Sequence, residues 1–184
     1  DNERVNAVLG VKSLTEEGQF LVLVTQRGIV KRIALSELKN ITRRGLNVMI
    51  LKPKDRLVTA CLTTGEDDVM MVTEEGMSIR FHAVDIRARH RAAGGVKGMV
   101  LAPKDKIVAA DIAVLDSKLL VISRNGFGKI TDLNRYRTQG RAGAGQSHQP
   151  SPHRPAVEQD QPDEPQHPPA ERGRTRGVGG AAGA

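Results

Sequence analysis

Three short stretches decide the fold: TQRGIVKR at residues 25–32, TEEGMSIR at residues 73–80 and SRNGFGKI at residues 123–130. Each has glycine at its fourth place, and these glycines follow one another at intervals of 48 and 50 residues. A four-residue apolar run precedes each stretch, which is typical of a strand buried on both faces and is too short for a helix. Because glycine accepts the positive φ of a tight turn without steric cost, each stretch predicts a β-hairpin.

The similarity between the repeats continues beyond the hairpins. An apolar or aromatic residue stands ten residues past each glycine and is expected to be a buried anchor: Leu38, Ile86 and Tyr136. Further on, GLNVMILKPKDRLV (residues 45–58) matches GVKGMVLAPKDKIV (residues 95–108), and the Pro-Lys-Asp triplet predicts a turn between two more strands. The opening ERVNAV resembles the end of this phrase, so the chain is expected to start inside a repeat.

Each repeat therefore predicts about four short strands in roughly 50 residues, with no amphipathic helical stretch between them. This period and content are typical of a propeller-like array of four-stranded antiparallel blades, which makes the fold class all-β. One blade cannot bury both of its faces alone, so neighbouring blades must stack. The repeats account for about three blades, and the array is expected to be incomplete.

Charge and composition divide the chain into two parts. Residues 1–145 carry 24 basic and 16 acidic side chains, whereas residues 146–184 carry 4 and 5. The second part holds seven of the nine prolines and has no Leu, Ile, Met, Phe or Tyr, so it is expected to be a disordered tail rich in Pro, Gln, His and Gly. The abrupt change is what an out-of-frame segment, a pseudogene or an assembly error would produce.

The remaining composition limits the location and the chemistry. No apolar run is long enough for a membrane span, and the first ten residues do not form a signal peptide. Cys61 is the only cysteine, which favours a reducing, cytoplasmic setting. No nucleophile, base and orienting residue occur together, and the histidines lack metal-ligand companions, so neither catalysis nor a metal site is expected. The run Glu66-Asp67-Asp68 is interpreted as an acidic surface turn.

Three longer phrases carry a family resemblance: TQRGIVKRIALSEL, IRFHAVDIRARHRAAGGVKGM and RNGFGKITDLNRYRTQGRAGAG. Over residues 1–145 they resemble the C-terminal domain of the A subunit of DNA gyrase, a type II topoisomerase. The resemblance implies a β-pinwheel whose basic rim binds and bends duplex DNA, contributing to ATP-dependent negative supercoiling. It also implies that the partners are DNA, the rest of the gyrase A protein and the gyrase B protein, and that ATP and Mg²⁺ act elsewhere in the holoenzyme, with no cofactor in this fragment.

One departure from the family concerns its Gln-Arg-Arg-Gly-Gly-Lys-Gly box, which is linked to supercoiling. The box is not intact here: QGRAGAG (residues 139–145) resembles its weaker counterpart in the third repeat, with Ala144 where the pattern usually has Lys. The resemblance also implies that the active-site tyrosine of the family lies elsewhere in the holoenzyme. Tyr136 is expected to be a core anchor and not that tyrosine, because it aligns with Leu38 and Ile86.

The candidate DNA contacts are cations that recur at matched or neighbouring repeat positions. An arginine stands fifteen residues past each glycine, at Arg43, Arg91 and Arg141, and a regular array would place such residues along one rim. Cations on a curved rim favour DNA that bends to reach them, and phosphate contacts position DNA without reading its sequence. The full set is Lys31, Arg32, Arg43, Arg44, Arg80, Arg87, Arg89, Arg91, Lys97, Lys129, Arg137 and Arg141.

Three alternatives remain open from the sequence. The C-terminal domain of the topoisomerase IV A subunit is the near relative of the gyrase domain. A propeller-like array could instead be a protein-binding scaffold whose basic rim meets an acidic partner. The fragment could also be a remnant without function. Salt-dependent binding to duplex DNA favours a DNA-binding domain over the scaffold.

Overall fold

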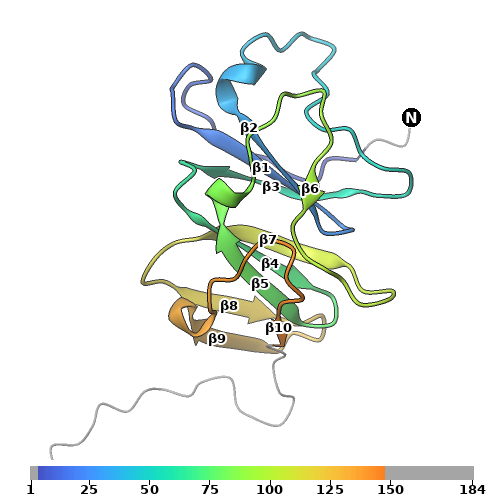
Figure 1. The fold of residues 1–184 in the computed structure, drawn as a ribbon, viewed down its shortest axis with the longest axis vertical. Helices are drawn as coiled ribbons and strands as arrows, with labels where there is room; N and C mark the ends of the chain where they lie inside the picture. The colour runs from blue at the N-terminus through green and yellow to red at the C-terminus, as the bar shows by residue number, and fades with distance from the viewer. Residues whose placement is uncertain (1–3, 148–184) are drawn as a thin grey trace, which may run out of the picture.

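The computed structural model describes residues 4–147, and within that range the chain is built from β-strands and short 3₁₀ turns without an α-helix. The predicted fold class is confirmed (Figure 1). The strands are β1 (Phe20–Thr25), β2 (Ile29–Ala34), β3 (Leu57–Thr63), β4 (Asp68–Thr73), β5 (Met77–His82), β6 (Val96–Lys97), β7 (Ile107–Ala113), β8 (Lys118–Ile122), β9 (Gly128–Asp132) and β10 (Gln146–Ser147). The 3₁₀ turns are η1 (Leu35–Leu38), η2 (Ala83–Asp85) and η3 (Leu133–Arg135).

All three predicted hairpins form, and glycine makes each turn possible. The φ angles of Gly28, Gly76 and Gly126 are 73°, 78° and 83°, in the left-handed region that side chains disfavour. A hydroxyl three residues before each glycine completes the turn by accepting a hydrogen bond from the amide of the residue after the glycine, at 3.2 Å in every repeat. These hydroxyl groups belong to Thr25, Thr73 and Ser123. The repeated stretches therefore share a turn chemistry as well as a spacing.

The strands pair in a way that the repeats alone did not predict. The first sheet has the order β3-β1-β2-β6 and the second has the order β10-β5-β4-β7. The predicted four-stranded antiparallel blades are therefore confirmed for the first two repeats, but one edge strand of each, β6 or β10, comes from the following repeat. Residues 46–47, which correspond to β6, form no strand, because the described chain offers no preceding hairpin edge with which they could pair.

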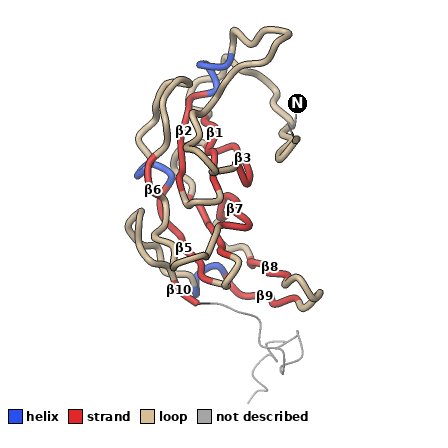
Figure 2. Tube along the Cα trace, turned by 90° about the vertical axis from the view of Figure 1, so that its right-hand side faces the viewer, coloured by secondary structure: helices blue, strands red, loops and turns tan. Residues whose placement is uncertain are grey.

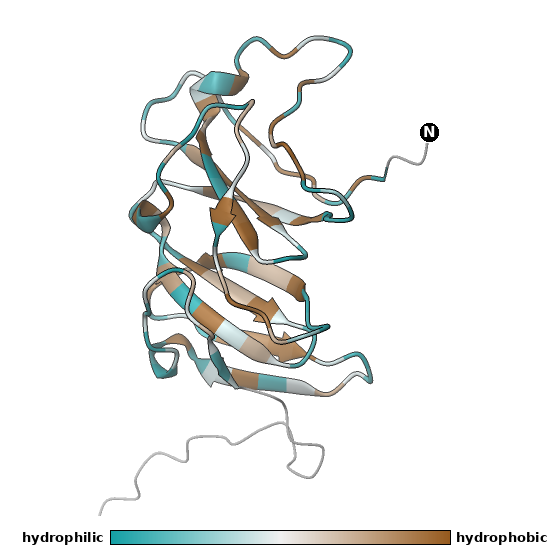
Figure 3. Cartoon of the chain, turned by 45° about the vertical axis from the view of Figure 1, so that its right-hand side comes forward, coloured by the Kyte–Doolittle hydropathy of each residue, from teal (hydrophilic) through white to brown (hydrophobic). Residues whose placement is uncertain are grey.

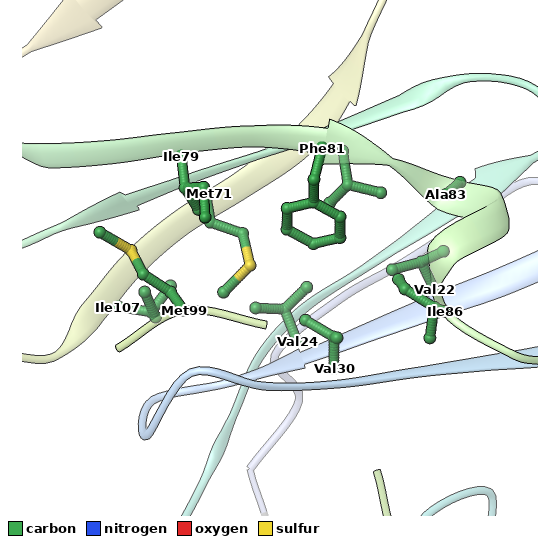
Figure 4. Close-up of a cluster of buried hydrophobic side chains, with 11 residues drawn as sticks. Val22, Val24, Val30, Met71, Ile79, Phe81, Ala83, Ile86, Met99 and Ile107 are labelled. Atoms are coloured by element: carbon green, nitrogen blue, oxygen red, sulfur yellow. The ribbon is translucent and has the colours of Figure 1, made fainter. Parts of the chain in front are cut away.

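The sheets stack along the long axis of the molecule, with β6 and β10 on one side and β3 and β7 on the other (Figure 2). Between the first two sheets lies a cluster of buried side chains, in which Val22, Val24 and Val30 meet Met71, Ile79 and Phe81 (Figure 4). The predicted anchors Leu38, Ile86 and Tyr136 are all buried, at 8%, 1% and 3% exposure. Hydrophobic residues concentrate in the strands and hydrophilic residues in the connecting loops (Figure 3).

The third repeat supplies β10 to the second sheet, and its own sheet within the described residues has only two strands, β8 and β9. One face of this hairpin packs on the second sheet through Leu119. Three other apolar residues of the hairpin are more than half exposed: Leu120 at 56%, Ile122 at 65% and Ile130 at 56%. β10 extends the β-structure two residues beyond the expected boundary at residue 145. The predicted disorder of the tail concerns residues 148–184, which lie outside the described residues.

Candidate nucleic-acid interface

The loops that follow the 3₁₀ turns hold most of the candidate cations. η1, η2 and η3 lie one above another at the left of Figure 1, because each begins where the second strand of a hairpin ends. The second of these loops, residues 85–97, is called the rim loop here. It runs along the open edge of β2: the amide of Arg89 donates to the carbonyl of Arg32 at 2.9 Å, and Val96 and Lys97 form β6.

Eight of the twelve predicted cations are exposed, and four of them lie on the rim loop. Around the bridge between Ala88 and Arg32, Arg87 and Arg89 flank Ala88, so in this extended backbone their side chains emerge on the same side. The exposed set is Arg43, Arg44, Arg87, Arg89, Arg91, Lys97, Lys129 and Arg137. These side chains are free of the core and are available to a polyanion.

Two predicted contacts are buried, and for them the expectation of a surface position is wrong. Lys31 is 1% exposed, and Arg80 is 6% exposed. Lys31 Nζ donates to three backbone carbonyls, while Arg80 donates from Nε to Asp68 at 2.6 Å and from Nη1 to the carbonyl of Leu133 at 3.1 Å. A buried charge requires such partners because desolvation is costly. Both cations therefore stabilise the fold and cannot reach a phosphate from where they lie.

Arg32 and Arg141 are half-buried and only partly available. The guanidinium of Arg32 lies 4.6 Å from the centroid of the Phe20 ring, and burial lowers its pKa from the ordinary value. Its Nε has no hydrogen-bond partner among the described residues. Arg141 donates to the carbonyls of Asp85 and Lys97, so this third member of the recurring arginine set is engaged with the rim loop.

The acidic run before β4 also differs from its prediction. Glu66 is exposed, but Asp68 is 6% exposed and belongs to β4, where it accepts the hydrogen bond from Arg80. Asp67 forms the turn itself, and hydrogen bonds from Thr63 and Thr64 hold its pKa below the ordinary value. Only part of the run is therefore a surface turn.

The exposed cation Lys39, directly after η1, was missed in the candidate set. Lys39 stands eleven residues past Gly28, as Arg87 stands past Gly76, and this repeat position indicates it from the sequence. Lys39 and Arg91 line the same open hollow, together with Glu37 and Leu46. Glu37 also lies 3.1 Å from Nδ1 of His90, a residue of the rim loop. The hollow thus brings the loops of the first two repeats together.

Among residues 4–147, no group of three His, Cys, Asp or Glu side chains is arranged to hold a metal ion. No helix in the same range is long and apolar enough to cross a membrane. What the arrangement can do is present guanidinium and ammonium groups from three successive loops to a polyanion.

Comparison with known proteins identifies the family. Residues 19–60, 67–113 and 117–147 match the family described as "DNA gyrase C-terminal domain, beta-propeller". The A subunit of DNA gyrase from Clostridium acetobutylicum is 52% identical over 144 residues, which are 78% of this chain and 17% of that protein. The chain thus spans about a sixth of the length of that relative.

Two solved structures have the same fold. The DNA gyrase A C-terminal domain aligns with a TM-score of 0.71 at 27% identity, over 79% of this chain and 48% of that one. The C-terminal domain of DNA topoisomerase IV aligns with a TM-score of 0.70 at 27% identity, over 74% of this chain and 43% of that one. Because the family match covers all three hairpins described above, this chain belongs to the DNA gyrase C-terminal domain family of β-propellers.

Proposed function

We propose that this chain is a DNA-binding and DNA-wrapping part of the gyrase A protein. Duplex DNA lies against the exposed cations of the three loops and bends along them, which contributes to ATP-dependent negative supercoiling in the holoenzyme. The rest of the gyrase A protein and the gyrase B protein supply the catalytic residues, and ATP and Mg²⁺ act there. The protein works in the cytoplasm, and this fragment alone neither cleaves DNA nor hydrolyses ATP.

The observation that carries the proposal is the row of exposed cations on loops that stack along one side. Bending a site of 20–30 bp smoothly by 40–90° costs on the order of 1–6 kcal/mol, so several phosphate contacts are needed to offset it. Lys39, Arg43 and Arg44 on the first loop, the rim-loop cations and Arg137 on the third loop supply these contacts. Contacts of this kind position a duplex without reading bases.

Two other functions have less support. A topoisomerase IV subunit has the same fold, but the curated relative reported above is a gyrase A protein. A scaffold that binds an acidic protein would use the same cations, but it needs no row of them along one side.

A salt titration of the whole chain separates these functions. Fluorescence anisotropy with two unrelated duplexes should give equal affinities, and log K should fall against log salt with a slope near −5 if about six phosphates are neutralised. Excess polyglutamate at the same salt should leave most of the DNA bound. Absence of salt-dependent DNA binding, or complete displacement by polyglutamate at low concentration, would overturn the proposal in favour of the scaffold.

A further inference from the structure

We propose that Lys31 is a positioning residue for the DNA-binding surface: its buried ammonium group holds the rim loop on the arc along which DNA bends. This inference rests on the proposed function. It concerns a residue that cannot itself contact the duplex, because only 1% of its surface is exposed.

The hydrogen bonds of Lys31 join two loops that are far apart in the sequence. Nζ donates to the carbonyls of Val48 at 2.8 Å, Arg91 at 2.7 Å and Ala93 at 2.8 Å. An ammonium group has three hydrogens and no acceptor, so these bonds use its full capacity. The first acceptor belongs to the connection after η1 and the other two belong to the rim loop. One side chain therefore fixes the rim loop against the first repeat.

Burial and a neighbouring positive charge both disfavour the charged form of Lys31. Burial lowers the pKa of Lys31 below its ordinary value, the nearby charge of Arg89 lowers it further, and Glu37 raises it in part. An ammonium group beside an exposed arginine is repelled by it. The three carbonyl dipoles compensate for the lost water, so the arrangement exists only while the rim loop keeps its shape.

The rim loop is held at other points that do not duplicate this one. The backbone of Arg89 bonds to β2, and Arg141 bonds to the carbonyls of Asp85 and Lys97. Between these points lie Arg91 and Ala93, and the carbonyls of both accept from Lys31. His90, the residue before Arg91, also contacts Glu37 of the first repeat, but through an exposed side chain. Without the ammonium group, the backbone carbonyls of Arg91 and Ala93 lose their hydrogen bonds to the first repeat.

The first repeat provides a matched control for Lys31. Lys52 is an exposed lysine beside the first Pro-Lys-Asp turn and is not one of the candidate DNA contacts. Lys31→Met and Lys52→Met each remove one positive charge from the first repeat. Methionine keeps nearly the length of the lysine side chain and fills the buried site without donating a hydrogen bond.

The test uses the full chain and three measurements on both variants. Amide hydrogen exchange of the rim loop, without DNA, should be about tenfold faster in Lys31→Met and unchanged in Lys52→Met, because only Lys31→Met removes the charged hydrogen-bond network. Energy transfer between the labelled ends of a duplex of about 30 bp should show less bending with Lys31→Met, whereas Lys52→Met should bend bound DNA as the parent does. The salt slope of Lys31→Met should match the parent, because no phosphate contact is removed.

Two results would overturn the inference. Unchanged rim-loop exchange and unchanged bending in Lys31→Met would show that the ammonium group positions nothing. A slope flattened by about 0.9 with unchanged exchange would show a direct phosphate contact. If Lys31→Met fails to fold, Lys31→Arg decides in the same way, because it keeps the charge but alters the donor geometry. If the parent chain binds no DNA, the proposed function fails, and faster exchange in Lys31→Met would then show a fold-stabilising bond without a role in DNA binding.

Discussion

Arg80 and Asp68 form an ion pair in the interior of the second sheet: Nε and Oδ2 lie 2.6 Å apart, and both side chains are 7% exposed. The two equivalent residues of the first repeat, 48 positions earlier, are Arg32 and Phe20, and there the arginine lies over the aromatic ring instead. The same strand position thus holds an arginine by two different interactions. In the second repeat the arginine also reaches the carbonyl of Leu133, which ties the sheet to the third repeat.

Asp68→Asn should destabilise the chain strongly. The substitution leaves the buried charge of Arg80 without its carboxylate, and breaking a buried pair in this way costs about 3–5 kcal/mol. Urea unfolding of the full chain measures the loss. Glu66→Gln removes a charge two residues away at an exposed site and should change the free energy of unfolding by less than about 0.5 kcal/mol. Equal effects of the two substitutions would contradict the role assigned to the pair.

The hairpin glycines should differ in their tolerance of a side chain. Gly28 and Gly126 share a positive φ, but a Cβ on Gly28 would lie 3.0 Å from the carbonyl oxygen of Met99, whereas a Cβ on Gly126 would meet open space. Gly126→Ala should therefore cost only the left-handed backbone penalty of about 1–2 kcal/mol. Gly28→Ala should cost more, because the backbone at Met99, which follows β6, must also shift. Thermal unfolding compares them, and a smaller loss for Gly28→Ala would be inconsistent with the packing at this turn.

Cys61 should make stability depend on pH in the alkaline range. Burial, with a smaller effect of Asp111, raises the pKa of its thiol from the ordinary 9.0 to about 11. Between these values the unfolded chain releases the proton while the folded chain keeps it, so stability falls as the pH rises from 9.0 towards 11 and is unaffected by this thiol below 9.0. The expected loss is about 1 kcal/mol per pH unit in that window.

Urea unfolding of the parent and of Cys61→Ala at pH 8 and pH 10 isolates this effect. The smaller side chain lowers the free energy of unfolding of the variant by the same amount at both pH values. The parent loses stability at the higher pH, so the difference in free energy of unfolding between the two proteins should shrink there. A difference that is the same at both pH values would mean that the thiol is not shielded in the folded chain.

The hairpins and anchors were predictable because their causes are local. A tight turn requires glycine, and a short apolar run between polar residues forms a buried strand. The exchange of β6 and β10 between repeats could not be predicted in this way. Their two-residue pairings depend on which hairpin edge lies nearby, and that is set by the stacking of the sheets.

The candidate cations could be predicted as a set, but their accessibility could not. Both faces of β1 and β2 are covered by neighbours, so an alternating pattern does not reveal which residues are exposed. The burial of Lys31 depends on its acceptors Arg91 and Ala93. These lie 60 and 62 residues away in the sequence, so the burial could not be predicted from the residues around Lys31. The burial of Asp68 had a usable signal, because its repeat equivalent is the aromatic Phe20.

The rim loop and the Pro-Lys-Asp turns each carry three exposed positive charges, so substitutions in the two places can be compared for their effect on DNA binding. Arg87, Arg89 and Arg91 are exposed on the rim loop. An equal number of exposed charges, Lys52, Lys54 and Lys104, lies in or beside the Pro-Lys-Asp turns. Those turns lie at the hairpin-turn end of the sheets, because Asp55 accepts from the amide of Arg27 at 3.1 Å. The two sets therefore have the same charge at different places on the surface.

The salt slope of DNA binding by the two triple variants tests the central claim most directly. Replacing Arg87, Arg89 and Arg91 by Gln should flatten the slope of log K against log salt by up to about 2.7, at about 0.9 for each lost phosphate contact. Replacing Lys52, Lys54 and Lys104 by Gln should leave the slope within error of the parent. An unchanged slope in the arginine variant, or equal flattening in both, would show that the rim loop is not where DNA binds.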